Sequence, residues 1–270
     1  MDKLQTNKDK SLSEGLSKDS LPIETLLALD STIVEIEKPL LSKMKRRELF
    51  KFIPIVAASL SVPFLGEDLI KQGLKFSDWL SEKLYNPYKL AESFTDNQVT
   101  SLEKFPYNTY DKHDPEIDLD NWSLSVEGLV EKAGEYKLEQ IKALPKYTQN
   151  TRHICIEGWD VIGNFSGARL ADFFKLAGAD PKARFVEVIC ADYYYSSYDM
   201  ASCLHPQTLL CYEMYGKPLD RGHGAPLRIH MPIKLGYKSS KYLISLRVSN
   251  VLSRDKGFWE DQGYSWFGGI

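Results

Sequence analysis

A thiol, an imidazole and a carboxylate occur at alternate positions of one segment, as Cys155, His153 and Glu157 of Thr151-Arg-His-Ile-Cys-Ile-Glu-Gly-Trp159. If this segment is a strand that ends at Gly158, its period of two places the three side chains on one face. A thiol in this setting is either a nucleophile with a base beside it or a metal ligand with polar neighbours. Because free cysteine is among the most buried residue types, the three residues taken alone favour an inert core thiol.

Other chemical motifs are missing from the sequence. It holds no GxGxxG after a strand, no GxxxxGK[ST], no HExxH and no GxSxG, which excludes the commonest nucleotide-binding, zinc-protease and serine-hydrolase classes. The four cysteines, Cys155, Cys190, Cys203 and Cys211, form no CxxC pair. A zinc ribbon and a small disulfide scaffold are therefore both disfavoured.

The composition is that of an ordinary folded chain. The 270 residues are 43% hydrophobic and 26% charged, and the net charge is −3. This balance excludes collagen-like and wholly disordered classes. Without a broad basic surface to neutralise phosphates, we expect no nucleic-acid partner.

The N-terminal region has the layout of a targeting segment. Residues 1–45 are polar, Lys45-Arg-Arg-Glu-Leu-Phe-Lys51 is basic, and residues 52–66 are uncharged. The apolar run of about 15 residues is shorter than the ~20 of a membrane-spanning helix, and the paired arginines resemble a twin-arginine signal. We therefore expect residues 1–66 to direct folded export to the periplasm. A clear small-x-small cleavage site is missing, which leaves a retained membrane tether open; the alternative is a buried helix of a cytoplasmic domain.

The remaining chain predicts a helical lead-in over residues 67–104 and a catalytic domain over residues 105–270. The lead-in helix ends before Asn86-Pro87. Two short helices are expected near 136–144 and 170–177, the second ended by Gly178. Alternation predicts strands within 122–128, 151–158, 184–190, 226–232 and 242–249. Because strands outnumber helices and do not alternate strictly with them, the fold class is α+β.

The segment Arg152-His-Ile-Cys-Ile-Glu-Gly-Trp159, followed by Phe165-Ser-Gly167, resembles the molybdenum-site segment of the sulfite oxidase superfamily. It is most similar to the export-type branch that includes the catalytic subunit of periplasmic protein-methionine-sulfoxide reductase. The resemblance covers about residues 105–270. Further matches follow in order: Ala191-Asp192, His205-Pro-Gln-Thr-Leu-Leu210, Gly216-Lys-Pro-Leu219, His223-Gly-Ala-Pro-Leu-Arg228, Met231-Pro-Ile-Lys-Leu-Gly-Tyr-Lys238 and Gly257-Phe-Trp-Glu-Asp-Gln-Gly-Tyr-Ser-Trp-Phe-Gly-Gly269.

The resemblance implies a sulfite-oxidase-type molybdopterin-binding domain with mixed sheets and short helices. Its cofactor is one molybdenum ion held by a pyranopterin dithiolene and by the thiolate of Cys155. His223 and Arg228 match residues that bind the phosphate end of the pterin, and an arginine suits this because its planar fork donates two hydrogen bonds. The other cofactor-binding residues that the resemblance implies are Asn108, Tyr110, Cys190, Ser239, Ser240 and Lys241.

Departures from the family pattern concern the substrate. Sulfite-oxidising members carry an arginine cluster around the metal, whereas this chain has Glu157 beside its cysteine, and a carboxylate would repel sulfite. We therefore assign Glu157 to the catalytic site together with Cys155. Trp159, the run 193–195, Tyr198 and Asp199 are expected to form a neutral or amphipathic pocket rim. Residues 233–238 differ from the Trp-Lys-Tyr-Gly-Phe-Lys of the methionine sulfoxide reductase branch, which indicates a sister group.

The sequence thus predicts a periplasmic molybdenum oxidoreductase that carries out oxygen-atom transfer, or an equivalent two-electron reaction, on a small molecule or an S-oxide or N-oxide, and not on sulfite. No CxxCH motif is present and no haem is expected in this chain, so a redox partner, either a membrane b-type or a soluble c-type cytochrome, would exchange its electrons. Two alternatives stay open: a molybdopterin-binding protein without catalysis, and a cytoplasmic thiol enzyme that uses Cys155 with His153.

Overall fold

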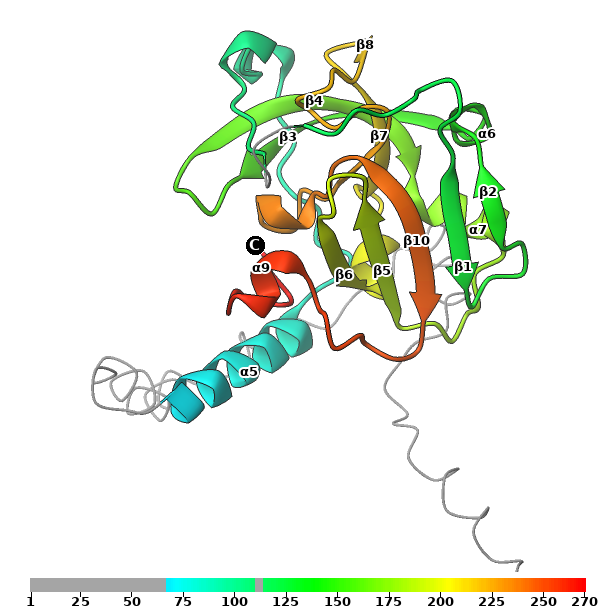
Figure 1. Cartoon of the computed structure of the whole chain (residues 1–270). Helices are drawn as coiled ribbons and strands as arrows, with labels where there is room; N and C mark the ends of the chain where they lie inside the picture. The colour runs from blue at the N-terminus through cyan, green and yellow to red at the C-terminus, as the bar shows by residue number, and fades with distance from the viewer. Residues whose placement is uncertain (1–66, 110–113) are drawn as a thin grey trace, which may run out of the picture.

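A computed structural model describes residues 67–109 and 114–270, in which two sheets, one mixed and one antiparallel, enclose the core (Figure 1). The helices are α5 (Glu67–Leu84), α6 (Leu138–Lys142), α7 (Leu170–Ala177), α8 (Met200–Cys203) and α9 (Phe258–Asp261), with 3-10 helices η4 (Asp96–Gln98), η5 (Leu102–Lys104) and η6 (Gly236–Lys238). The strands are β1 (Leu124–Gly128), β2 (Gly134–Tyr136), β3 (Lys146–Ile154), β4 (Asp160–Arg169), β5 (Phe185–Cys190), β6 (Tyr195–Asp199), β7 (Leu209–Met214), β8 (Lys217–Pro218), β9 (Arg228–His230) and β10 (Leu243–Ser249).

The first sheet joins the two ends of the domain. Its strand order is β2-β1-β10-β5-β6, and β1 runs parallel to β10 with Ser125 opposite Ser245. The other neighbours in this sheet are antiparallel. The first and last strands of the domain are therefore direct neighbours in one sheet.

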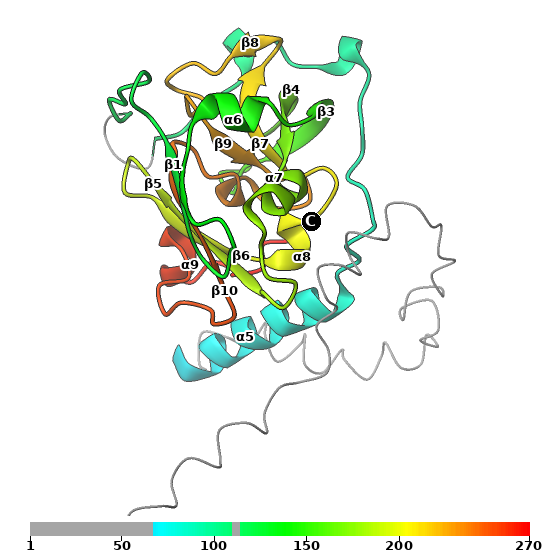
Figure 2. The same ribbon diagram turned by 90° about the vertical axis from the view of Figure 1, so that its right-hand side faces the viewer.

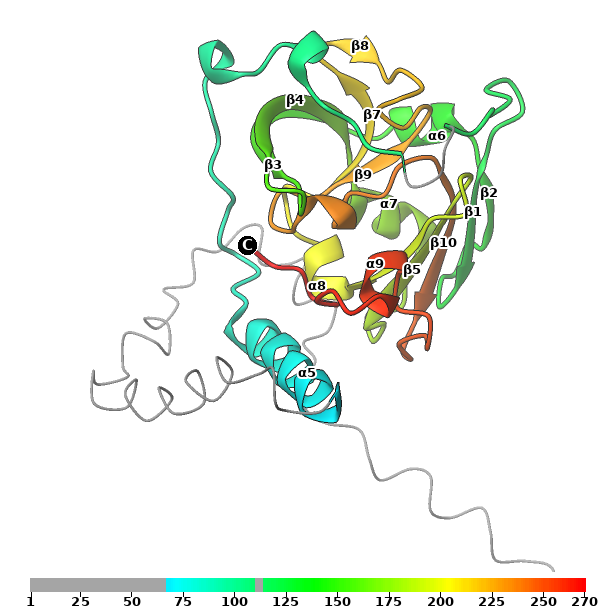
Figure 3. The ribbon, with the colours of Figure 1, turned by 60° about the vertical axis from the view of Figure 1, so that its left-hand side comes forward.

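The second sheet has the order β3-β4-β7-β8, with β9 paired to β7. Its long β3–β4 hairpin pairs continuously from Lys146 opposite Ala168 to Ile154 opposite Asp160, and it curves around the body (Figure 3). A Cβ on Gly167 would lie 2.1 Å from the carbonyl oxygen of Leu210, so the bulge between β4 and β7 requires glycine there. The hairpin turn carries the segment that begins at Cys155.

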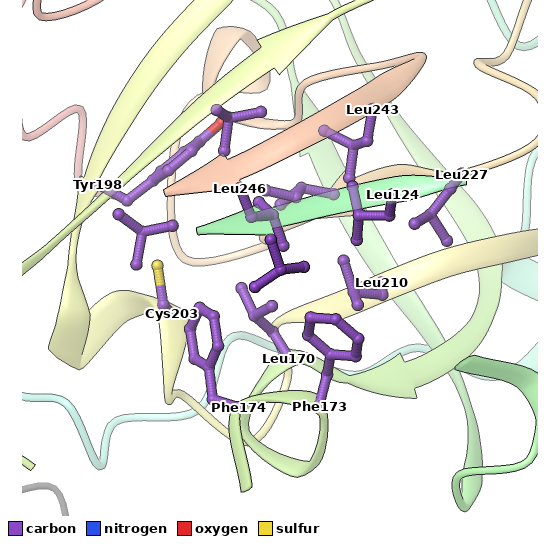
Figure 4. Close-up of a cluster of buried hydrophobic side chains, with 14 of the residues drawn as sticks. Leu124, Leu170, Phe173, Phe174, Tyr198, Cys203, Leu210, Leu227, Leu243 and Leu246 are labelled. Atoms are coloured by element: carbon purple, nitrogen blue, oxygen red, sulfur yellow. The ribbon is translucent and has the colours of Figure 1, made fainter. Parts of the chain in front are cut away.

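The main core lies between the first sheet and α7 (Figure 4). Helix α7 buries residues at helical spacing, among them Leu170, Phe173 and Phe174. Gly178 ends the helix in the left-handed conformation, with φ of 67°. From the sheets, Leu124, Leu210 and Leu246 close the same cluster, which fixes the frame on which the functional loops are built.

Helix α5 lies outside both sheets, at the far end of the molecule from β8 (Figure 2). The carboxylate of Asp78 connects it to the C-terminal segment, accepting from Oγ of Ser265 at 2.5 Å and from the backbone N–H of Trp266 at 3.1 Å. On another face Phe76 and Trp79 are 44% and 51% exposed. In the described ranges no helix has the length and apolar character needed to cross a bilayer.

The α+β class and all three expected helices are confirmed. The five expected strands correspond to β1, β3, β5, β9 and β10, but β2, β4, β6, β7 and β8 were missed. Strand β6 was misread as a pocket rim because buried Ser196 and Ser197 mask its apolar alternation. The expected signal over residues 1–66 lies outside the described residues.

Candidate active site

A cavity of about 550 Å³ lies where six separate segments of the domain converge. The segments are the approach to β1, the β3–β4 turn, the β5–β6 turn, the stretch that enters β9, the η6 loop and the region of α9. A cavity lined mainly by apolar side chains with a few polar groups is the usual form of a cofactor site. The lining residues are Phe105, Pro106, Tyr107, Asn108, Thr109, His153, Cys155, Ile156, Glu157, Trp159, Asp192, Tyr194, His223, Arg228, Gly236, Tyr237, Ser239, Ser240, Lys241, Phe258, Trp259, Gln262 and Tyr264.

Cys155 lines this cavity from a tight turn, and the expectation of a strand continuing to Gly158 is wrong. Strand β3 ends at Ile154, and the N–H of Gly158 then donates to the carbonyl oxygen of Cys155 at 3.3 Å. Gly158 has a φ of 90°, in the region that favours glycine. The turn exposes the thiol to the cavity, and a turn at a strand end is a common place for a functional side chain.

Glu157 forms the exposed side of the same turn. Its carboxylate accepts from Nε1 of Trp159 at 3.1 Å. Hydrogen bonds from Asn108 and then from Trp159 lower the pKa of Glu157, because both favour the ionised form. Asn108 Nδ2 also donates to Sγ of Cys155 across 3.7 Å. The thiol therefore has an amide donor and a carboxylate as neighbours, and no guanidinium from the turn.

His153 lines the cavity but does not act as a base toward Cys155. No hydrogen bond connects the two side chains, both of which the structure describes. Burial lowers the pKa of His153 to about 3, and burial raises the pKa of the Cys155 thiol. A neutral imidazole beside a protonated thiol does not form the ion pair of a cysteine nucleophile, so this geometry disfavours the thiol-enzyme alternative.

The cavity also contains the buried Arg228 and the partly buried Lys241, neither of which has a carboxylate partner among the described residues. Arg228, 4% exposed at the start of β9, donates to three carbonyl oxygens: those of His223 at 3.0 Å, Ser239 at 3.3 Å and Ile229 at 3.5 Å. Within the described ranges no carboxylate lies at ion-pair distance from it. A buried charge with neutral neighbours is costly unless an anion completes its environment.

Lys241 and His223 lie at the same end of the cavity as Arg228. Lys241 Nζ donates to the carbonyl oxygens of Asn108 and Gly222, each at 2.8 Å, and burial followed by the nearby Arg228 charge lowers its pKa to about 8. His223 Nδ1 lies 2.8 Å from Asp220, whereas its Nε2 is buried without a partner among the described residues. A buried nitrogen without a partner on the wall of a cavity is available to a ligand that enters the cavity.

The η6 loop brings its backbone close to the other walls. A Cβ on Gly236 would lie 2.8 Å from Nε2 of His153, so this close approach requires glycine. Ser239 and Ser240 follow and line the cavity. Side chains and backbone of this loop therefore face the region where the cations gather, which suits a phosphate-bearing cofactor.

Some predicted site residues lie elsewhere. Cys190 is fully buried and does not line the cavity, although its thiol hydrogen-bonds to Ser240. Tyr110 lies outside the described residues. Of the expected rim, Trp159 and Tyr194 line the cavity, but Tyr193 is 82% exposed and does not. Tyr195, Tyr198 and Asp199 are also off the cavity: they bond to Asp261, Ser240 and Lys234.

The wall contributed by the C-terminal segment was missed. It consists of Phe258, Trp259, Gln262 and Tyr264, and Phe105 and Tyr107 close the cavity from the approach to β1. The sequence held a signal for the first group, because Gly257–Gly269 belongs to the family resemblance. A single helical turn followed by a loop gives no clear periodicity, so the place of these aromatic residues at the site required the fold.

Comparisons with known proteins agree with this geometry. Residues 111–259 match the family described as Oxidoreductase molybdopterin binding domain. The chain is 43% identical over 197 residues to an Azospira oryzae protein provisionally named protein-methionine-sulfoxide reductase subunit YedZ1, covering 72% of this chain and 74% of that protein. It is 30% identical to the protein-methionine-sulfoxide reductase catalytic subunit MsrP of Xanthomonas campestris, covering 67% of this chain and 62% of that protein. It is 29% identical to the sulfite oxidase of Arabidopsis thaliana, covering 68% of this chain and 55% of that protein.

The chain therefore belongs to the molybdopterin-binding oxidoreductases of the sulfite oxidase superfamily. The predicted fold class, the predicted enzyme class and the molybdopterin cofactor are confirmed at this level. The chain spans less than two thirds of the length of the MsrP and sulfite oxidase relatives.

Proposed function

We propose that this protein is a periplasmic molybdenum oxidoreductase that reduces S-oxides, with a methionine sulfoxide side chain as the type of substrate. The observation that carries the proposal is that one cavity holds both the turn-borne Cys155 and the cations Arg228 and Lys241, which have no carboxylate at ion-pair distance among the described residues. Both named relatives of the sulfoxide reductase type support the substrate class. The twin-arginine-like segment supports the location.

The residues present fit the cofactor. Cys155 would hold the molybdenum, and Arg228, Lys241, the orphaned Nε2 of His223 and the η6 loop would hold the phosphate end of the pterin. When bound, the cofactor supplies two-electron oxygen-atom transfer. The side-chain amide of Asn108 orients the sulfur of Cys155. The backbone carbonyl oxygen of Asn108 accepts a hydrogen bond from Nζ of Lys241.

The substrate side of the cavity favours neutral or cationic molecules. Glu157 is ionised at neutral pH because hydrogen bonds lower its pKa, so it repels a sulfite dianion. Trp159, Trp259 and Tyr264 line the same cavity and present apolar area to a thioether-like side chain. Electrons would come from a separate cytochrome, of a membrane b-type or a soluble c-type.

The test uses the full chain from a host that makes the cofactor. About one molybdenum and one pterin per chain, with reduction of methionine sulfoxide by a reduced dye, is the expected result, and Cys155→Ala should lose the activity. Pterin without turnover of any S-oxide or N-oxide would favour the non-catalytic alternative. A wild-type chain without pterin would overturn the proposal.

A further inference from the structure

A buried ion pair lies behind the cavity wall, between Lys238 and Glu260. Both side chains are 1% exposed, and neither residue lines the cavity. Lys238 Nζ bonds to Oε1 of Glu260 and donates to the carbonyl oxygen of Ser197 at 3.1 Å. The same carboxylate oxygen accepts from Oγ of Ser196 at 3.2 Å.

The two partners come from the two walls that would face different ligands. Lys238 ends η6, directly before Ser239, Ser240 and Lys241, which line the cavity on the cofactor side. Glu260 belongs to α9, which brings aromatic side chains to the same cavity. Figures 1 and 3 show α9 close to the η6 segment. The pair therefore connects the loop that would bind the cofactor to the wall that a substrate would contact.

The geometry of the Lys238–Glu260 pair is poorly suited to stabilising the fold. Oε2 of Glu260 is buried without a hydrogen-bond partner in the described part of the chain. Desolvation of two charges usually offsets most of their attraction, and an unsatisfied oxygen adds to that cost. The Glu260 carboxylate also packs against Gly257, where a Cβ would lie 2.1 Å from Oε2. An ion pair under these conditions is better explained by the geometry that it fixes.

We propose that Lys238 and Glu260 are positioning residues that transmit occupancy of the cofactor loop to α9, so that the substrate wall is ordered only when the cofactor is bound. The inference rests on the proposed function for the nature of the two ligands. The direct hydrogen bonds from the side chains of Lys238 and Ser196 to one carboxylate make the coupling short-ranged.

The test compares the full chain with Lys238→Met/Glu260→Gln, each produced with and without cofactor synthesis in the host. Hydrogen exchange of backbone amides is followed in residues 236–241 and 257–264. In the wild type, cofactor loading should slow exchange in both segments. In the double variant, loading should still slow exchange in 236–241 but leave 257–264 unchanged. Equal protection of 257–264 in both proteins would overturn the proposal.

A kinetic readout and a matched control complete the test. For the loaded double variant, KM for methionine sulfoxide should rise about threefold to tenfold with kcat within about twofold of wild type. The control is Lys234→Met/Asp199→Asn, which removes another buried pair, 3.1 Å long, that does not join the two walls. The control should keep the wild-type KM and exchange response; an equal change in both variants would show a general loss of packing. A wild-type chain without pterin contradicts the proposed function instead, whereas a loaded chain with uncoupled walls contradicts this inference alone.

Discussion

The side-chain amide of Asn108 donates to Sγ of Cys155 across 3.7 Å, while the backbone carbonyl of Asn108 accepts from Nζ of Lys241 at 2.8 Å. One residue from the approach to β1 thereby contacts both the thiol and the cationic end of the cavity. Because Cys155 lies on the β3–β4 turn and Lys241 follows η6, Asn108 links segments that belong to different parts of the fold.

Replacement of the thiol is the first prediction. Cys155→Ala should lower S-oxide reductase activity by at least about a thousandfold, because the molybdenum loses its protein ligand. The fold should persist, since Cys155 lies on a turn at the cavity and not in the core. Activity, metal content and circular dichroism of the purified protein measure these effects.

The matched control is Cys203→Ala. Cys203 is fully buried in the main core and lies away from the cavity. We expect wild-type metal content and a loss of unfolding free energy of roughly 1–2 kcal/mol from the small cavity. Equal metal loss in both variants would contradict the assignment of Cys155.

Removal of the buried guanidinium should weaken cofactor retention. Arg228→Met deletes charge-assisted hydrogen bonds that an anion would receive, so we expect about tenfold to hundredfold weaker retention of the pterin. Pterin fluorescence after gel filtration measures it. The control is Arg247→Met, which changes an exposed arginine in weak surface ion pairs. This variant should retain the pterin as the wild type does.

The frame of the site was predictable from local patterns. Alternation and the glycine at 178 identified β1, β5, β10 and α7, because these elements bury one regular face against one core. The residues grouped around Arg228 and Lys241 were placed by family resemblance, which the cavity lining supports. The proposal that they bind an anion also rests on their neighbours in the fold, which are carbonyl oxygens and which the sequence did not reveal.

The remainder depended on tertiary structure. The tyrosines at 193–195 are adjacent in sequence, yet one faces solvent, one lines the cavity and one bonds to Asp261. Tyr193 has a φ of 66°, so a tight turn breaks the strand pattern there. Similarly, the Cys155 turn violates the period-two expectation because Gly158 permits a reversal that apolar alternation does not reveal.

The charge of Glu157 should determine preference among substrates. We expect Glu157→Gln to raise kcat/KM for a methionine sulfoxide peptide flanked by glutamates about twofold to tenfold, because repulsion at the turn disappears. For a lysine-flanked peptide the value should fall. Steady-state kinetics at low ionic strength measures kcat/KM for each peptide, and the ratio of the glutamate-flanked to the lysine-flanked value reports the preference.

Glu127→Gln is the control for that experiment, since Glu127 is an exposed carboxylate in β1 that does not line the cavity. Its ratio for the two peptides should equal that of the wild type. High salt should reduce the effect of Glu157→Gln, because the interaction involves a solvent-exposed carboxylate. A ratio that does not respond to Glu157→Gln would contradict a role of this residue in specificity.

Acid should destabilise the fold through His205 well before the carboxylates titrate. Burial lowers the pKa of His205 to about 4 from 6.5, and its Nδ1 accepts from the backbone N–H of Gln207 at 3.2 Å while Nε2 faces the carbonyl oxygen of Lys89. Between pH 6.5 and about 4, His205 therefore binds a proton in the unfolded chain but stays neutral in the folded chain. The contribution is fully present above pH 6.5 and is lost as the pH falls toward 4, by at most about 1.4 kcal/mol per pH unit. Chemical denaturation of the wild type and of His205→Gln at pH 7.5, 6.5 and 5.5 should give a flatter pH dependence for the variant. Parallel curves would show that protonation of His205 does not limit stability in this range.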